Sequence, residues 1–172
     1  MTMTRRAAAG AFSLAALALA GGAARGARSR PSGSEMRARF IRYVEQFNSG
    51  RPEGLVPFYA PGVVLYLPGR ELVGPDAIVA HYRRSFGFLT EWLRIDSLIA
   101  DENGLAAELY TRFSAHRDYP EFKARPLRAG DVYVVTTFAL FDFDDAGRFT
   151  RIRPALWHRD LSGVRGQEGD GD

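Results

Sequence analysis

The stretch that decides the fold is "YVEQFNSGRPEGLVPFYAPGVVLYLPG", residues 43–69, because its hydrophobic pattern changes from a helical to an extended one. The triplet "NSG" at 48–50 predicts the end of a helix, and Pro52 predicts the start of a second, short one. The β-branched run at 62–67, stopped by Pro68, predicts a strand. The helix that leads into this stretch is indicated by apolar residues at helical spacing, which are Met36, Phe40, Tyr43, Val44 and Phe47.

Two further helix starts are indicated by capping and proline signals. Ser32, with Glu35 three positions on, has the spacing of a capping box, in which two side chains satisfy free backbone amides at a helix start. Pro75 predicts the start of a later helix, whose apolar face carries Ile78, Val79, Tyr82 and Phe86. The first half of the chain is therefore expected to be mainly helical.

The second half of the chain predicts an antiparallel sheet. Four strand-like stretches follow one another, at residues 90–100, 104–116, 130–143 and 147–158. The segments "DENG" and "DDAG" supply the Asn-Gly and Asp-x-Gly patterns of tight turns between neighbouring strands, because they tolerate a positive φ. Helices followed by a long meander predict an α+β domain with its helices on one face of the sheet.

The composition of the chain excludes several classes of site and partner. A chain of 172 residues is long enough for one domain with a hydrophobic core. It has no cysteine, which excludes disulfides, thiol catalysis and cysteine-ligated zinc or iron–sulfur centres. The histidines are not at metal-ligand spacing, so neither a metal nor another cofactor is expected. No basic run with interleaved aromatic residues is found, and we expect no nucleic-acid partner.

The N-terminal 24 residues are interpreted as an export signal. Arg5 and Arg6 precede an uncharged run rich in alanine, leucine and glycine that ends at Ala24, and this order is typical of a signal peptide. The arginine pair resembles a twin-arginine signal. The run is short and weakly hydrophobic for a membrane span, so the mature form is expected to have none. An uncleaved tail is the alternative.

Export sets the expected organisation and location of the remaining chain. We expect cleavage after Ala24 and a periplasmic or secreted protein, with a linker at 25–34, a folded domain at 35–160 and a polar, disordered tail at 161–172. Arg5 and Arg6 are two of the 23 basic residues, and without them the basic residues outnumber the 20 acidic ones by one. The basic pI of the full sequence therefore reflects its leader rather than a binding surface.

The order of these segments resembles the nuclear transport factor 2-like superfamily, and within it the SnoaL-like group. The resemblance is carried by residues 43–69, by "LVGPDAIVAHYR" at 72–83 and by "FDFDDAGRFTRIR" at 141–153. It implies a cystatin-like cone, in which a strongly curved antiparallel sheet wraps around about three helices and leaves a pocket inside. This fold hosts isomerases, dehydratases, hydrolases, cyclases and non-catalytic binders, so it does not by itself assign a function.

This sequence lacks most of the residues that two enzyme mechanisms of the superfamily require. A ketosteroid isomerase needs an Asp base together with a Tyr and a protonated Asp as oxyanion donors. The resemblance places Tyr43 at the phenol position, Leu67 at the position of the base and Ala139 at the position of the second donor. An epoxide hydrolase of the limonene type requires an Arg-x-Asp pair, whereas the corresponding stretch at 108–110 is Glu-Leu-Tyr.

Proton transfer next to a carbonyl requires fewer groups, namely a histidine or carboxylate that moves the proton and a phenol that polarises the carbonyl oxygen. The candidates are Tyr43 as oxyanion donor, with Glu108 or His116 moving the proton. Glu108 and His116 are about 26 Å apart on an ideal strand, so they cannot act on one carbonyl. Glu108 lies in an apolar strand, and pairing with Arg112 or Arg153 is the structural alternative to a role in a pocket.

Two classes of function therefore remain open. The first is a binder of a small hydrophobic ligand, and the second is a cofactor-independent lyase or isomerase acting on a hydrophobic carbonyl compound. Aromatic residues that suit the lining of an apolar pocket are Tyr66, Trp92, Tyr110, Tyr133 and Trp157. The resemblance also implies a homodimer that forms through the sheet.

Overall fold

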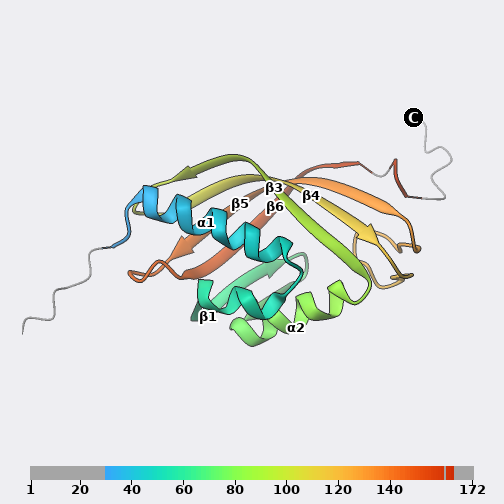
Figure 1. Cartoon of the computed structure of the whole chain (residues 1–172), viewed down its shortest axis with the longest axis horizontal. Helices are drawn as coiled ribbons and strands as arrows, with labels where there is room; N and C mark the ends of the chain where they lie inside the picture. The colour runs from blue at the N-terminus through green and yellow to red at the C-terminus, as the bar shows by residue number, and fades with distance from the viewer. Residues whose placement is uncertain (1–29, 161, 165–172) are drawn as a thin grey trace, which may run out of the picture.

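The computed structural model describes residues 30–160 and 162–164 of the chain, so the expected export signal at 1–24 lies outside the described residues. In Figure 1 the helices lie on one side of a curved sheet. The helices are α1 (Gly33–Asn48), the 3₁₀ helix η1 (Pro52–Phe58) and α2 (Pro75–Phe86). The strands are β1 (Tyr59–Leu67), β2 (Arg70–Val73), β3 (Leu89–Ala100), β4 (Leu105–Ala115), β5 (Val132–Phe143) and β6 (Phe149–Asp160).

The six described strands form one sheet in the order β2-β1-β6-β5-β4-β3. The meander β3-β4-β5-β6 is antiparallel, as the sequence predicts. β1 joins β6 in parallel, so the sheet is mixed rather than wholly antiparallel. Parallel pairing is open to these two strands because a long connection separates them. The short strand β2, which the sequence did not indicate, pairs with β1 across a turn at Gly69, whose φ is 73°.

Helix α1 begins and ends where its sequence predicts. The capping box is confirmed: the Glu35 amide donates to Ser32 Oγ at 3.3 Å, and the Ser32 amide donates to Glu35 Oε2 at 2.8 Å. Its apolar face packs on the sheet, where the rings of Phe40 and Phe141 meet edge-on with centroids 4.8 Å apart. We call the face of the sheet that α1 covers the inner face.

The last residue of α1 fixes the outermost strand of the meander. Asn48 Nδ2 donates to the Leu93 carbonyl and the Leu93 amide donates to Asn48 Oδ1, both at 2.8 Å. A single side chain thus makes the pair of bonds that a neighbouring strand would make on the free edge of β3. Arg37 also donates to the Leu98 carbonyl on this strand. These contacts hold β3 against α1 and fix its position along the helix.

A second apolar cluster lies at the far end of the inner face, under the long loop between β4 and β5. Its buried members are Leu89, Ala115, Tyr119, Leu127, Tyr133, Val135 and Val164. Val164 falls within the tail expected at 161–172, and beside it the Val132 amide donates to the Gly163 carbonyl at 2.9 Å. The described fold therefore extends at least to Val164. Within the described residues, no helix is long and apolar enough to span a bilayer.

Candidate functional site

One carboxylate lies on the inner face of the sheet. Glu91 is in β3 between Leu89 and Leu93, which are both buried on the same face. Its neighbour across the β3–β4 ladder is Phe113. Glu91 itself is half-buried, and among the described residues it has no hydrogen-bond or ion-pair partner. A carboxylate in such surroundings is costly to keep charged.

Burial raises the pKa of Glu91 from its ordinary value of 4.5 to about 8. No cation close by offsets this effect, since desolvation is its sole cause. At neutral pH the side chain is therefore mostly a neutral carboxylic acid that can donate a proton, and it becomes a base a little above neutral pH. A group whose pKa lies near the working pH is suited to proton transfer.

Three tyrosines gather within electrostatic reach of Glu91. They come from three elements: Tyr43 from α1, Tyr59 from the start of β1 and Tyr82 from α2. Burial raises the pKa of Tyr43 to about 12 and holds those of Tyr59 and Tyr82 well above 10, and negative charge on Glu91 adds to the effect at all three. All three phenols are thus neutral hydrogen-bond donors at any physiological pH.

Two of these phenols are joined to each other. The hydroxyl oxygens of Tyr43 and Tyr59 are 3.2 Å apart, and either can donate. Around them the rings pack edge to face: Tyr43 against Phe149 at 5.2 Å, and Tyr82 against Phe47 at 4.9 Å. The site therefore consists of one acid and three phenols in an aromatic wall. It has donors for a neutral oxygen, and among the residues that the structure describes no cation shifts the pKa of its acid.

The structure places the residues predicted from sequence at separate locations. Tyr43 is 4% exposed and belongs to the inner group. Glu108 is half-buried on the outer face, because its flanking residues Ala107 and Leu109 are the ones that face inward. His116 is exposed just beyond the end of β4, where its amide donates to the Phe88 carbonyl at 2.9 Å. These three side chains are not brought together.

The structural alternatives for Glu108 are also separated. Among the described residues Glu108 forms no ion pair within 4 Å, and Arg112 is exposed. Arg153 instead donates to Asp142 Oδ1 at 2.6 Å, in a partly buried cluster that also holds Arg151. The ion pair expected for Glu108 from sequence is thus absent from the described part of the chain.

The aromatic residues expected to line a pocket divide between the two faces. Tyr133 is 3% exposed on the inner face and stacks on Phe113 with centroids 5.6 Å apart. Trp92 and Trp157 are 42% and 71% exposed on the outer face, and Tyr110 packs edge-on against Trp92. Tyr66 is half-buried in β1, on the side opposite Val63 and Leu65. Tyr133 is therefore the one of these five that lies on the same face as Glu91.

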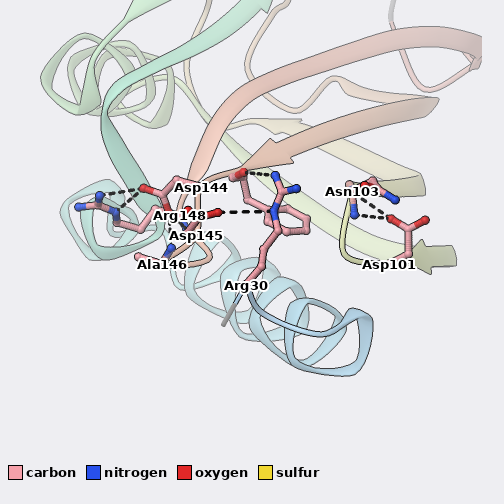
Figure 2. A network of polar contacts seen from close by, with 9 residues as sticks. Arg30, Asp101, Asn103, Asp144, Asp145, Ala146 and Arg148 are labelled. Atoms are coloured by element: carbon pink, nitrogen blue, oxygen red, sulfur yellow. Dashed lines mark hydrogen bonds and ion pairs between the residues drawn. The ribbon is translucent and has the colours of Figure 1, made fainter. Parts of the chain in front are cut away.

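Two hollows in the described surface lie away from Glu91. One, of about 350 Å³, lies between α1 and the β5–β6 turn, and the other, of about 290 Å³, lies beside the β3–β4 turn. Figure 2 shows the polar contacts of the neighbouring β5–β6 turn, where Arg30 forms an ion pair with Asp145 at 3.7 Å and Asp144 pairs with Arg148. In the part of the chain that the structure describes, no cluster of three or more His, Asp or Glu could hold a metal.

Glu91 and its partners are residues that the sequence interpretation passed over. The signal was present, because strict alternation along "LTEWLRI" at 89–95 puts Glu91 in phase with two leucines and an isoleucine. Reading the face of every carboxylate in every strand would have found it. The tyrosines were harder to identify, because Tyr82 has the same spacing as core residues and Tyr59 precedes the predicted strand.

The comparisons with known proteins define first the fold and then the family. A proposed polyketide cyclase of Xanthomonas campestris pv. campestris is 24% identical, with a TM-score of 0.63 over 71% of this chain and 90% of that one. A second proposed polyketide cyclase, from Silicibacter sp. TM1040, is 22% identical, with a TM-score of 0.63 over 77% and 94%. A protein of unknown function with a cystatin-like fold, from Methylobium petroleophilum PM1, is 20% identical, with a TM-score of 0.57 over 83% and 90%.

These likenesses confirm the α+β, cystatin-like cone. The family model of the SnoaL-like domain matches residues 40–152, which is more than half of the chain. The chain therefore belongs to the SnoaL-like domain family, as its sequence indicates. No curated protein matches it significantly, so what it binds or transforms has to come from its own residues.

Proposed function

We propose that this domain binds a small hydrophobic molecule at the inner face of its sheet, beside Glu91. The observation that carries the proposal is a carboxyl group without a protein partner among the described residues, set in an aromatic wall with the buried phenols of Tyr43 and Tyr59 and the half-buried phenol of Tyr82. An apolar surface with a few convergent polar groups is the usual composition of a small-molecule site. A neutral ligand is favoured because the site offers donors and no fixed cation.

A second function, proton transfer on that ligand, is favoured specifically by the pKa of Glu91. With a pKa of about 8, the minor fraction of Glu91 that is ionised near neutral pH can take a proton from carbon, and the carboxylic acid that results can return it without a cofactor. A ligand carbonyl whose oxygen lay near Tyr43 or Tyr59 would accept a hydrogen bond there, which stabilises the negative charge that develops when the neighbouring carbon is deprotonated. The proposed polyketide cyclases among the compared structures support a carbonyl compound as the ligand class.

The binding proposal is tested by native mass spectrometry. The protein is incubated with an extract of bacterial small molecules, and bound masses are compared between the parent, Glu91→Ala and the outer-face control Glu108→Ala. We expect a hydrophobic compound bound to the parent and to the control and weakened in Glu91→Ala. Equal binding by all three variants would contradict a site at Glu91.

The proton-transfer proposal uses the captured compound in heavy water. If Glu91 moves a proton to and from carbon, the compound gains deuterium with the parent and with Glu108→Gln, and at least about a hundredfold more slowly with Glu91→Gln, since a positioned acid–base group contributes about 10²–10⁴ in rate. Binding without deuterium uptake would leave the domain a binder and would refute the catalytic function.

The outer face of the sheet supports a homodimer. Large apolar side chains are exposed on it although water surrounds them, and such patches mark association surfaces. They are Trp92, Ile99, Phe138, Leu140 and Trp157. Sedimentation of the parent should give a dimer that Trp157→Lys converts to a monomer, whereas Val73→Lys, an exposed position on β2, leaves it intact. A monomeric parent would refute the dimer.

We also propose export to the periplasm or beyond, on the strength of the leader at 1–24. Its arginine pair is the feature that twin-arginine export would recognise. In a fractionated bacterial host, the parent should accumulate in the periplasm in a shortened form, and the double change Arg5→Lys, Arg6→Lys should leave it in the cytoplasm at full length. An unshortened parent in the cytoplasm would refute export.

A further inference from the structure

The loop between β4 and β5, residues 116–131, has a firmly held base. Tyr119 and Leu127 pair as an isolated bridge, with N–O distances of 2.7 and 3.1 Å. Below the bridge, the Ala129 amide donates to Asp118 Oδ1 at 2.8 Å. Tyr119 and Leu127 are both buried in the second apolar cluster. The base of the loop is thus part of the folded core.

The tip of the loop consists of residues 120–126, between the two residues of this bridge. Its one aromatic side chain, Phe122, packs against Phe113 with centroids 5.3 Å apart and against Tyr133 at 5.8 Å. Phe113 is the residue that lies beside Glu91 on the neighbouring strand. The tip therefore covers the inner face directly next to the acid.

Two polar contacts fasten the tip to elements on the other side of the site. Glu121 forms an ion pair with Arg84 of α2, two residues from Tyr82. Lys123 Nζ donates to the Pro68 carbonyl, in the turn between β1 and β2, at 3.1 Å. Phe113 pairs with Glu91 across the β3–β4 ladder, and Arg84 lies two residues from Tyr82 on α2, so the tip links the strand beside the acid to the helix that carries Tyr82.

We propose that residues 120–126 form a lid over the Glu91 site, latched by the Arg84–Glu121 and Lys123–Pro68 contacts. This rests on the proposed function for the site itself. The two latches are exposed, with 64% and 68% of the Arg84 and Glu121 side chains accessible, and exposed pairs of this kind contribute little. The base is buried and hydrogen-bonded, so the tip can lift while the bridge at Tyr119 stays closed.

Lifting the tip has a direct consequence for a ligand. It removes Phe122 from Phe113 and opens the aromatic wall next to Glu91, and closing it again brings the same ring onto the bound molecule. The lid thus controls both entry and the exclusion of water, on which the raised pKa of the acid depends.

The absence of cysteine from the sequence allows a clean test of access. Glu91→Cys introduces the only thiol, and its alkylation by iodoacetamide is followed by mass spectrometry. Adding Glu121→Gln and Lys123→Ala should speed the alkylation about threefold or more, since each exposed contact holds the tip by only about 0.2–1 kcal/mol. The matched control instead adds Glu53→Gln, which removes the ion pair between Glu53 of η1 and Arg83 of α2. The Arg83 and Glu53 side chains are 63% and 59% exposed, much like those of the latch, and this change does not alter the loop.

The outcomes separate the lid from the function of the site. An unchanged rate without the latches, an equal rise with Glu53→Gln, or no alkylation in any variant would overturn the lid. Hydrogen exchange of residues 88–93 in the chain that keeps Glu91 gives the same comparison if the thiol variant does not fold, with faster exchange expected without the latches. Neither readout needs a ligand, so a failure of the proposed function leaves the lid testable and the reverse also holds.

Discussion

Replacing Glu91 with glutamine should change how the stability of this domain depends on pH. Glutamine keeps the size of the side chain and its polar atoms but cannot ionise. In the parent, burial raises the pKa of Glu91 from 4.5 to about 8. The folded protein therefore holds a proton that the unfolded chain gives up between these two values, and unfolding in this window releases it.

The sign and size of the effect follow from this linkage. The stability that the neutral acid contributes is fully present below about pH 4.5 and is lost as the pH rises through about 8. The interval between the two pKa values corresponds to about 5 kcal/mol, at about 1.4 kcal/mol for each tenfold change.

Urea unfolding followed by far-ultraviolet circular dichroism measures the effect between pH 5 and 9. Relative to Glu91→Gln, the parent should lose about 4 kcal/mol of unfolding free energy across this range, with most of the loss above pH 6. Glu108→Gln on the outer face is the matched control and should not reproduce this difference. Parallel curves for the parent and Glu91→Gln would show that the acid is solvated like any surface carboxylate and would refute the reasoning.

Three further changes test the surroundings of the acid. Tyr43→Phe removes the 3.2 Å contact with the Tyr59 hydroxyl and should cost about 1–2 kcal/mol of unfolding free energy; a double-mutant cycle with Tyr59→Phe that gave no coupling would contradict this. Asn48→Ala deletes both hydrogen bonds to Leu93 and should cost about 1–3 kcal/mol, with faster amide exchange in β3 as the decisive sign. Ser32→Ala opens the capping box and should cost about 0.5–2 kcal/mol in thermal unfolding, whereas an unchanged midpoint would mean that the box contributes nothing.

Much of the fold could be predicted from local signals. The capping box at Ser32, the helix stop after Asn48 and the turns at 101–104 and 144–147 each fix a backbone conformation by short-range chemistry. The short strand β2 and the parallel union of β1 with β6 escaped prediction, because both depend on partners distant in the chain or on a turn at Gly69. The periodicity of hydrophobic residues does not tell which strands pair, because pairing depends on residues that are far apart in the sequence.

The site was harder to predict than the fold because it depends on which face of the sheet is covered. Alternation groups Glu108 with Tyr110 and Arg112 correctly, but it does not tell which group faces the helices. The structure turns Leu109 inward and Glu108 outward, while on the neighbouring strand Glu91 is turned inward. Tyr43 was identified because a helix shows its buried stripe directly, through residues that recur every third or fourth position.

The proposed site depends on one property of one side chain, the protonation of Glu91 in the folded protein. Carbon-13 labelling of the glutamate carboxyls, with Glu91→Gln used to assign the resonance, gives its titration by nuclear magnetic resonance without any ligand. We predict a midpoint near pH 8 in the parent. A midpoint below about 5.5, within the usual spread of glutamates in folded proteins, would contradict the claim that this domain keeps a neutral acid on its inner face.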